Sequence, residues 1–559
     1  MTGSRATPNP VEPARRTRPG GPGRALAVLV TVVSAALVWA ALTLPDRLSQ
    51  VEPAAFVTLP FEAVLLAAVA VLVPPRPRKV CALTAGIVLG VGLVLHLLDL
   101  AVRASLDRPF DVLHDWTYLG SLADLIRTST GPTTGDVLLT AAAVLLVGSV
   151  VAVPLALLRL TRLLAGRRRR ATPVLVVLSL AWSLLALLDT RVGGHPAASA
   201  GATAYTRDVV ARVQAERRDQ VAFASALTHD PLARTLSTTP PAGLLRGLRG
   251  KDVLVVFVES YGRAAVNGSW FSTGVRRVLE DGTRRLTADG FGARSAFLTS
   301  PTFGGISWLA HSTFESGTWV SSQQRYDQLL ASRRSTLSRA FARAGWRTVS
   351  DVPANTRAWP QGSFYGFDQF YDARNVGYAG PRFGYPTMPD QYTLEALHRL
   401  ELAPAHRRPV MAEVDLVSSH TPWARTPRMI DPGLVGDGSA YDAMPASLPS
   451  QREVWDSRAH VQAAYARAVE YSLRAVLSFV EQHSTDRTVL VVLGDHQPAT
   501  IVTGQDASHD VPVTVIARDE RVLHQVDGWH WQTGLLPGTR GPVWRMDTFR
   551  DRFLRAFSR

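Results

Sequence analysis

Carboxylates, imidazoles and hydroxyls follow the ends of several apolar runs in the C-terminal half of this chain. Glu259 and Ser260 follow VLVVFV, Asp495 and His496 follow VLVVLG, and His420 follows AEVDLVSS. Asp, Glu and His together with a deprotonated hydroxyl form a nitrogen and oxygen ligand set that suits Zn²⁺ or Mn²⁺. A divalent cation held by such a set lowers the pKa of a hydroxyl and neutralises charge on a phosphoryl group. These residues therefore predict metal-assisted chemistry at phosphorus.

Two hydroxyls are candidates for the nucleophile. The run SAFL leads into the loop TSPTFGG, which contains Thr302, and then to Ser307 at the start of the helical pattern WLAHSTF. Free N–H groups and the positive end of a helix dipole favour a phosphate beside Ser307. Thr302 has no helix behind it, and Pro301 removes one N–H, so we favour Ser307 and keep Thr302 as the alternative. His311, one turn beyond Ser307, faces the same pocket or is a structural histidine.

An α/β domain over residues 251–559 would bring these residues together. Apolar β-branched runs such as DVLVVFV, TVLVVLG and VPVTVIA alternate with amphipathic helical patterns. This alternation predicts a mostly parallel sheet sandwiched between helices. In such sheets the functional site lies at the carboxyl ends of the strands, where the candidate residues occur.

The N-terminal part predicts a helical membrane domain over residues 25–190. Its apolar segments are each long enough to cross a ~30 Å hydrocarbon core. The five predicted spans are 25–45, 54–74, 80–102, 137–158 and 172–189. The second is the weakest, because it contains Pro60 and Glu62. The single cysteine, Cys81, lies inside the third span, so no intrachain disulfide forms.

The loop charges predict the orientation of these spans. The formal net charge is +14, and much of the positive charge flanks the apolar segments. Basic residues precede the first span and fill the loops after the second and fourth spans, at Arg15, Arg16, Arg18, Arg24, Arg76, Arg78, Lys79, Arg159, Arg162 and 167–170. The other two loops, 46–53 and 103–136, contain few basic residues. The positive-inside rule then places the N-terminus in the cytoplasm and everything after residue 190 outside the plasma membrane.

Two further segments complete the predicted organisation. Residues 1–24 are rich in Pro, Gly and Arg and predict a disordered cytoplasmic tail. Residues 191–250 form a connector in which YTRDVVARVQAERRDQVAFASAL has apolar residues at helical spacing. We interpret this stretch as an amphipathic helix that packs on the following domain, and a helix on the membrane surface is the alternative.

The C-terminal motifs resemble those of the alkaline phosphatase superfamily, on its sulfatase-like branch. The motifs are FVES at 257–260, a helix-starting Ser307 shortly before Ser316 and Gly317, SSHTPW at 418–423 and LGDHQP at 493–498. Membrane spans followed by an extracytoplasmic domain are similar to the layout of lipoteichoic acid synthases and related phosphoglycerol and phosphoethanolamine transferases. The resemblance thus covers the architecture of most of the chain, whereas the specific motifs lie in the C-terminal domain.

The resemblance implies a role for each of the candidate residues. Glu259, Asp495 and His496 would bind one divalent cation, Mn²⁺ or Zn²⁺ with Mg²⁺ as a further option, and the nucleophilic hydroxyl would be the fourth ligand. The hydroxyl would carry a covalent phospho-group, and His420 would contact the transferred group or protonate a leaving oxygen. Residues 355–372 resemble the segment that shapes the substrate pocket, with Trp359 as its best-placed member; an aromatic cluster in the core is the other interpretation.

The chain departs from the family pattern at several positions. The membrane phosphotransferases typically use Thr where Ser307 occurs here. Sulfatases need a modified Cys or Ser with a Pro/Arg signature, whereas the sequence here is Ser-Trp-Leu-Ala-His. Ser260 replaces a second carboxylate beside Glu259, which favours one cation over two.

The sequence thus predicts a membrane-anchored phosphotransferase. It would move a phospho-alcohol head group from a membrane lipid to an envelope glycan or lipid, with no role for nucleic acid. A sulfatase-like hydrolase or phosphodiesterase and a non-catalytic envelope-binding protein are the alternatives.

Overall fold

The computed structural model describes residues 22–558 of the chain. The chain forms two compact units. The first contains Met1–His96 and Val144–Arg207, and the second contains Leu97–Ala143 and Asp208–Arg559. The predicted disordered tail, residues 1–24, lies outside the described residues except for its last three, which begin helix α1.

The first unit is built mainly from apolar helices. In the described part of the chain, four helices are long and apolar enough to cross a membrane. These helices are α1 (Pro22–Thr43), α3 (Pro75–Leu106), α5 (Pro132–Gly166) and α6 (Arg168–Leu187), and α3 and α5 continue into the second unit.

The predicted second span, 54–74, does not form a helix of that length. Its helix α2 (Phe61–Leu72) has only 12 residues, because it begins after Pro60 and ends before Pro74. Glu62 in its first turn is buried and accepts a hydrogen bond from the backbone N–H of Thr203 at 2.8 Å. The prediction of five full-length spans therefore becomes four long apolar helices and one short one.

The second unit contains a nine-stranded sheet. Its strand order is β12-β6-β11-β10-β5-β9-β7-β8, and β13 pairs with β6. The strands are β5 (Asp252–Val258), β6 (Gly292–Thr299), β7 (Arg347–Val352), β8 (Gln369–Asp372), β9 (Val410–Leu416), β10 (Thr488–Gly494), β11 (Asp510–Ala517), β12 (Gln532–Thr533) and β13 (Val543–Arg545).

The sheet is mixed, so the prediction of a mostly parallel sheet is confirmed only in part. Strand β11 is antiparallel to both of its neighbours, β10 and β6, and β12 is antiparallel to β6. The connection from β10 to β11 contains only a four-residue helix, α16 (Thr500–Thr503), whereas a parallel return needs a longer crossover. Because β11 runs against both neighbours, β6 points the same way as β10. The carboxyl ends of β5, β6, β7, β9 and β10 therefore meet at one edge.

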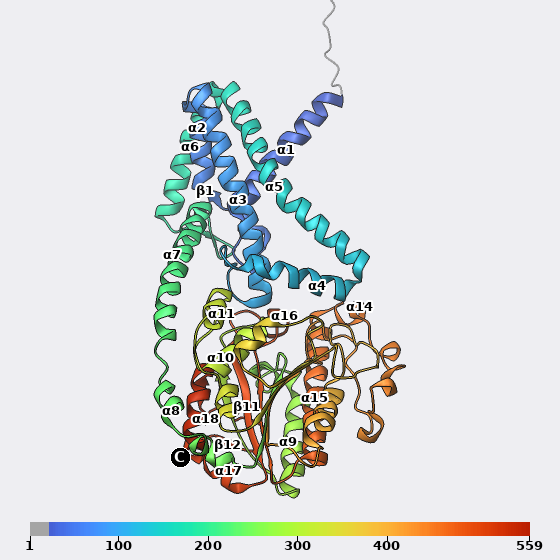
Figure 1. The fold of residues 1–559 in the computed structure, drawn as a ribbon. Helices are drawn as coiled ribbons and strands as arrows, with labels where there is room; N and C mark the ends of the chain where they lie inside the picture. Colours follow the sequence, from blue (N-terminus) through green and yellow to red (C-terminus); the bar gives the residue numbers. More distant parts are fainter. Residues whose placement is uncertain (1–21, 559) are drawn as a thin grey trace, which may run out of the picture. The chain divides into compact units, whose positions relative to one another are not determined.

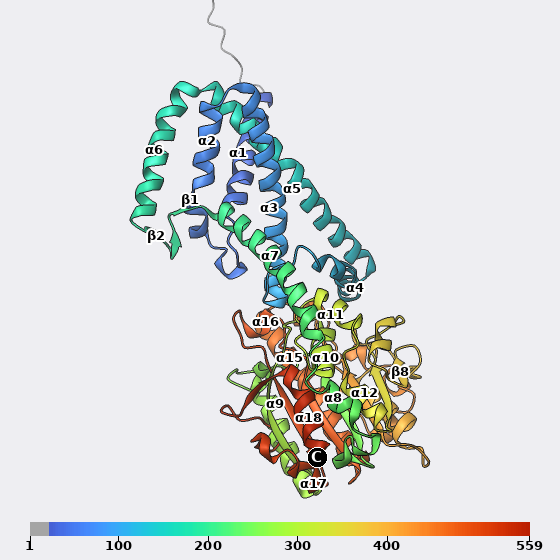
Figure 2. The same ribbon diagram turned by 60° about the vertical axis from the view of Figure 1, so that its left-hand side comes forward.

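Helices cover both faces of the sheet. The apolar side chains of α9 (Ser272–Ala288) and α15 (Arg458–His483) pack against one face, and those of α10 (Ser307–Ser316), α12 (Leu337–Arg343) and α18 (Phe549–Phe557) pack against the other. Figure 1 shows the ribbons of α10 and α18 on one side of the sheet and those of α9 and α15 on the other. Figure 2 brings the second face forward, with α12 and α18 over the sheet. Side chains of β5 alternate between the two cores, as a strand buried on both faces requires.

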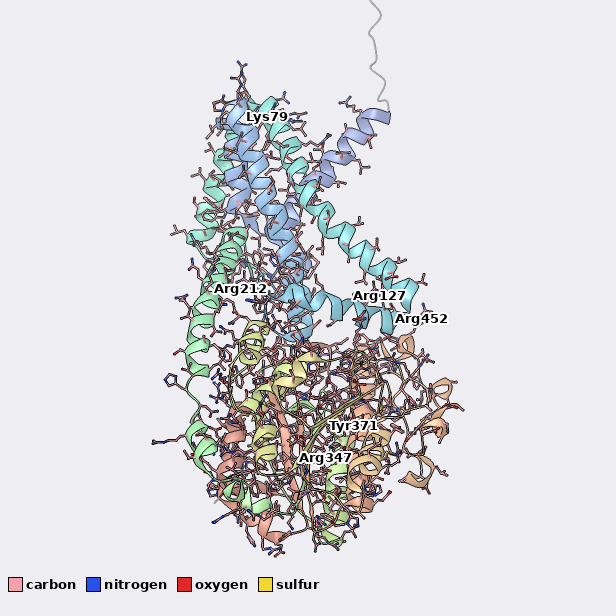
Figure 3. The ribbon with its side chains drawn as sticks, viewed as in Figure 1. Lys79, Arg127, Arg212, Arg347, Tyr371 and Arg452 are labelled. Atoms are coloured by element: carbon pink, nitrogen blue, oxygen red, sulfur yellow. The ribbon has the colours of Figure 1, made fainter. Side chains whose placement is uncertain are left out.

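Polar contacts join neighbouring elements at the edge of the sheet formed by β8. Arg347 of β7 binds Glu401 through two hydrogen bonds of 2.6 and 2.7 Å, and the Tyr371 hydroxyl of β8 donates to the same carboxylate at 2.8 Å. Figure 3 labels Arg347 and Tyr371 in this region. These bonds attach β7 and the edge strand β8 to the helical segment before β9.

The amphipathic helix of the connector corresponds to α7 (Gly201–Leu227). Its Asp219 binds Arg325 of α11 (Gln323–Leu330) at 2.7 and 2.5 Å, and the same guanidinium lies 4.8 Å from the centroid of the Phe223 ring. This part of α7 therefore packs against α11 within the second unit.

Candidate active site

The predicted nucleophile lies among the predicted metal ligands. Ser307 is the first residue of α10, and its Oγ lies 3.1 Å from Glu259 Oε2 and 3.2 Å from His496 Nε2. Glu259 follows β5, and Asp495 and His496 follow β10, so the parallel pairing of β5 with β10 brings the three ligands to one edge. One donor atom from each of Glu259, Asp495 and His496 lies within 4.8 Å of the others.

Backbone contacts fix the tautomer of His496. Its Nδ1 lies 2.8 Å from the carbonyl oxygen of Gln497, so Nδ1 carries the hydrogen and donates it. Its Nε2 lies 3.3 Å from both Glu259 Oε1 and Asp495 Oδ2. A histidine held by a carbonyl at Nδ1 and turned with Nε2 toward carboxylates has the arrangement of a metal ligand with its supporting hydrogen bond.

One oxygen of Asp495 has no hydrogen-bond partner. Its Oδ1 accepts hydrogen bonds from the backbone N–H groups of Ser260 and His496, both at 2.7 Å. Its Oδ2 is buried without a partner, and the Asp495 side chain is only 1% exposed. A buried carboxylate oxygen without a donor is costly. Its position beside His496 Nε2 and Glu259 fits a divalent cation as the missing partner.

The charges in the pocket also favour a bound cation. Burial alone would lower the pKa of His496, but the carboxylates of Asp495 and Glu259 outweigh it and raise this pKa to about 9. Burial raises the pKa of Glu259, yet the nearby imidazoles of His496 and His420 bring it below its ordinary value. Burial raises the pKa of Asp495 to about 6. The pocket therefore holds a proton on His496, and a cation would compete with that proton.

The backbone before Ser307 has an uncommon conformation. Ile306 precedes the helix with φ 64° and ψ 45°, a left-handed conformation that costs a β-branched residue about 1–3 kcal/mol. Ser307 is therefore the first helical residue, and its hydroxyl is free to point at Glu259 and His496. This strain immediately before a candidate nucleophile is typical of functional sites.

The alternative nucleophile, Thr302, has a different environment. Its Oγ1 donates to the carbonyl oxygen of Gly305 at 2.5 Å, and the residue is 7% exposed. That hydrogen bond closes the loop that leads to Ser307. The geometry thus favours Ser307 as the nucleophile and gives Thr302 a role in shaping the loop.

His420 lies near the metal-ligand cluster. Its Nδ1 is 2.5 Å from the carbonyl oxygen of Thr421, so Nδ1 carries the hydrogen, and its ring stacks on Tyr385 with centroids 3.7 Å apart. Burial lowers the pKa of His420, against the opposing effect of Glu259. The imidazole is therefore neutral at neutral pH, and its Nε2 is a proton acceptor.

Trp359 belongs to an aromatic cluster. Its ring lies 5.5 Å from Tyr365 and 6.0 Å from Phe370, and its side chain packs against the core on the α10 face of the sheet. These contacts fit the core interpretation of this segment. A role for Trp359 in substrate binding stays a prediction.

His311 meets two acidic residues that the sequence analysis did not single out. Its Nδ1 lies 3.1 Å from Glu413 Oε1 and 3.4 Å from Asp415 Oδ1, and its ring stacks on Phe257 at 3.8 Å. Glu413 and Asp415 occur at alternate positions of the buried strand β9. Two carboxylates on one face of an otherwise apolar strand were the signal that could have identified them.

The end of α3 and the segment after it contact the elements around the nucleophile, which the sequence did not indicate. The hydroxyl of Thr500 donates to the carbonyl oxygen of Ala104, and the Tyr118 ring packs edge-on against Trp308 with centroids 5.7 Å apart. A Cβ on Gly304 would lie 1.9 Å from the carbonyl oxygen of Ser105. A glycine at position 304 is therefore required for the close approach of the end of α3.

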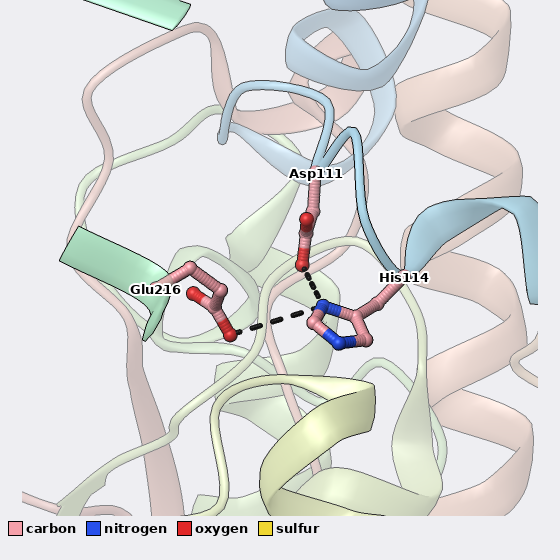
Figure 4. A group of neighbouring side chains, drawn as sticks. All are labelled: Asp111, His114 and Glu216. Carbon is pink, nitrogen blue, oxygen red and sulfur yellow. Dashed lines mark hydrogen bonds and ion pairs between the residues drawn. The ribbon is translucent and has the colours of Figure 1, made fainter. Parts of the chain in front are cut away.

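A small polar group ties the same segment to α7. The Nδ1 of His114 lies 2.9 Å from Asp111 Oδ2 and 3.9 Å from Glu216 Oε1 (Figure 4). Arg212 of α7 adds an ion pair with Asp99 at 3.0 Å. All three side chains in Figure 4 are partly exposed, so we interpret the group as a structural link.

Several solved structures are similar to part of the chain at low identity. Lipoteichoic acid synthase LtaP from Listeria monocytogenes is 17% identical, with a TM-score of 0.36 over 55% of this chain and 72% of that one. Phosphoglycerol transferase GacH from Streptococcus pyogenes is 12% identical, with a TM-score of 0.34 over 61% and 91%. Lipooligosaccharide phosphoethanolamine transferase A from Neisseria meningitidis is 14% identical, with a TM-score of 0.35 over 57% and 90%. The comparison with curated proteins found no match.

The family comparison covers the strands that form the active-site edge. The family model described as Sulfatase matches residues 251–514, which run from the start of β5 into β11. The matched range contains every residue of the proposed site, from Glu259 to His496. Over residues 251–514 the chain is therefore similar to the sulfatase family.

Proposed function

We propose that the protein is a membrane-anchored, metal-dependent phosphotransferase. It moves a phospho-alcohol head group, phosphoglycerol-like or phosphoethanolamine-like, from a lipid donor to a glycan or lipid acceptor of the cell envelope. The observation that carries this proposal is the position of the Ser307 hydroxyl, 3.1 Å from Glu259 and 3.2 Å from His496 at the N-terminus of α10. A hydroxyl among cation ligands at a helix N-terminus is suited to attack an anionic phosphodiester.

Glu259, Asp495 and His496 would hold one divalent cation, Mn²⁺ or Zn²⁺, with Ser307 Oγ as the fourth ligand. When bound, this cation lowers the pKa of the hydroxyl and neutralises charge on the phosphoryl oxygens. The first backbone N–H groups of α10 face the same region and stabilise negative charge there.

The reaction proceeds in two displacements. In the first, Ser307 Oγ forms a bond to phosphorus and loses its proton, the bond from phosphorus to the lipid oxygen breaks, and that oxygen takes up a proton. In the second, an acceptor hydroxyl attacks the phosphoserine, loses its proton and releases Ser307 Oγ, which is protonated again. Both displacements move one proton between oxygens, which a neutral imidazole can carry.

His420 is the proposed carrier of that proton. Its Nδ1–H is held by Thr421, so Nε2 is the atom that accepts a proton and returns it to the leaving oxygen. The stacking of its ring on Tyr385 limits rotation of the imidazole. The single carrier would serve as base and then as acid in each displacement.

The apolar helices support the proposed lipid donor. Four helices long enough to span a bilayer precede the catalytic half of the chain and would keep it at a membrane surface. The positive charge of the loops supports a topology with the N-terminus in the cytoplasm and residues 251–514 outside, where envelope acceptors occur.

The test uses the full-length protein in detergent with Mn²⁺ and phospholipids labelled in the head group. Mass spectrometry after rapid quenching should locate a phospho-adduct on Ser307 in the wild type. Ser307→Ala should lose the adduct, and Thr302→Ala should retain it. An adduct on Thr302, or full turnover by Ser307→Ala, would show that the nucleophile is wrongly assigned.

Turnover in the presence of candidate acceptors separates transfer from hydrolysis. A transferase releases the lipid product faster when an acceptor is added and attaches the label to that acceptor. Release of the free phospho-alcohol at a rate that no acceptor changes would instead indicate a phosphodiesterase. An absence of any adduct or turnover with every lipid tested would support a binding protein.

A further inference from the structure

A second group of potential metal ligands lies one helical turn from the nucleophile. His311, Glu413 and Asp415 each offer one donor atom, and these atoms lie within 4.8 Å of one another. His311 comes from α10, whereas Glu413 and Asp415 come from the same face of β9. One imidazole and two carboxylates form a ligand set that suits Zn²⁺ or Mn²⁺.

Two oxygens in this group are buried and accept no hydrogen bond. They are Glu413 Oε2 and Asp415 Oδ1, and the latter lies 3.4 Å from His311 Nδ1. Glu413 is only 5% exposed. A buried carboxylate that meets too few donors is costly unless a proton or a cation supplies the missing partner.

The local charge is unbalanced. A third carboxyl group, Glu315 on α10, is fully buried within hydrogen-bonding reach of Glu413. It lies close enough to Glu413 for each carboxyl to influence the pKa of the other. His311 contacts Glu413 and Asp415, and Glu315 adds a third buried carboxyl, so the balancing positive charge must come from bound protons or from a metal ion.

The group is separate from the cation site at Ser307. Ser307 and His311 are one helical turn apart, and Asp415 pairs in register with Phe257, two residues before Glu259. Both spacings place the two groups about 6 Å apart. Metal ions that share a bridging ligand are about 3.5–4 Å apart. A cation at His311 would therefore be an independent site beneath the nucleophile rather than half of a bridged pair.

We propose that His311, Glu413 and Asp415 bind a second divalent cation, Mn²⁺ or Zn²⁺, which anchors helix α10 to strand β9. The stacking of His311 on Phe257 holds the ring in place for this role. By neutralising the carboxylates and fixing α10, the cation keeps Ser307 at the start of that helix in position. The inference does not depend on which group the proposed enzyme transfers.

Metal counting tests the proposal directly. The full-length protein in detergent is loaded with Mn²⁺, desalted and analysed for bound metal by mass spectrometry. The wild type should retain two equivalents, and the Glu413→Gln/Asp415→Asn double variant should retain one. Glu259→Gln should also retain one, because it loses the cation at Ser307.

The matched control is Asp351→Asn. Asp351 lies on the neighbouring strand β7, is completely buried, and has two oxygens without partners, but it is not a member of the group. This variant should retain both equivalents. A loss of metal in Asp351→Asn equal to that in the double variant would mean that general disturbance of the buried sheet, not ligand removal, explains the result.

Thermal unfolding is a second test, because the proposal predicts which protein melts at the higher temperature with and without Mn²⁺. In chelator, the double variant should melt at the same temperature as the wild type or higher, because the amides remove buried negative charge. In Mn²⁺, the wild type should melt at a higher temperature than the double variant, because only the wild type gains stability from the second cation. Equal shifts on adding Mn²⁺ to both proteins would contradict a cation at His311.

The outcomes separate this proposal from the proposed function. One equivalent in the wild type that only Glu259→Gln removes would overturn the second site and leave the site at Ser307 in place. One equivalent that only the double variant removes would support the second site and contradict the cation at Ser307. A wild type that binds no metal would overturn both.

Discussion

Binding of the cation at Ser307 should depend steeply on pH. The pKa of His496 is raised to about 9, because the carboxylates of Asp495 and Glu259 outweigh the effect of burial. A raised pKa means that His496 is protonated at neutral pH before the cation binds, although the cation needs its unprotonated Nε2. Metal binding must therefore displace a proton, and affinity must rise with pH.

The magnitude follows from the pKa. At pH 7, about one imidazole in a hundred has a free Nε2, so the apparent affinity is about a hundredfold below its value at high pH. Between about pH 6.5 and 8.5 the dissociation constant should fall about tenfold for each unit of pH. Below about pH 6 the dependence should steepen, because the pKa of Asp495 is about 6 and its protonation removes a second ligand.

Isothermal titration calorimetry with Mn²⁺ measures this dependence. The Glu413→Gln/Asp415→Asn background isolates the cation site at Ser307 from the second one. Titrations at pH 7 in two buffers with different ionisation enthalpies should show the release of about one proton for each Mn²⁺ bound. His420→Gln is the control and should keep the same slope, because His420 Nδ1 is turned to Thr421. A dissociation constant that does not change with pH, without proton release, would refute His496 as a ligand.

Three further predictions concern the catalytic residues, the nucleophile loop and the topology. Glu259→Gln or His496→Gln should lower turnover at least about a hundredfold while circular dichroism stays unchanged, because each loses a proposed ligand; turnover that survives chelation would contradict this. Gly304→Ala should lower turnover at least about tenfold, because its Cβ would meet a backbone oxygen at 1.9 Å. Gly345→Ala, which has a similar positive φ and open space around it, should leave turnover unchanged. A reporter fused after Arg559 should behave as extracytoplasmic, and cytoplasmic activity of the reporter would refute the topology.

Much of the candidate site could be predicted because its residues directly follow strands. Glu259 follows β5, and Asp495 and His496 follow β10, and these two strands are neighbours in a parallel pairing. Strand ends are readable from sequence as the point where an apolar run meets polar residues. Parallel strands then bring their carboxyl ends together, so proximity of these side chains follows from local patterns alone.

Chain direction and span length were harder to predict. Strand β11 runs antiparallel to its neighbours β10 and β6 but has the same apolar pattern as they do. Strands buried on both faces look alike in sequence, whichever way they run. Composition likewise did not distinguish the short helix α2 from a span, since an apolar stretch also precedes Pro60, where the helix is limited. The effect of a proline on a helix depends on the backbone conformation around it.

Long-range contacts were decided only by the tertiary structure. The sequence by itself determined that a hydroxyl, two carboxylates and an imidazole follow the strands of an α/β domain behind apolar helices. The tertiary structure alone showed the tautomer of His496, the left-handed backbone at Ile306 and the contact of His311 with Glu413. These features depend on atoms far apart in the chain that meet only when α10 packs on the sheet. Local propensity contains no information about such contacts, because it reflects only neighbours in sequence.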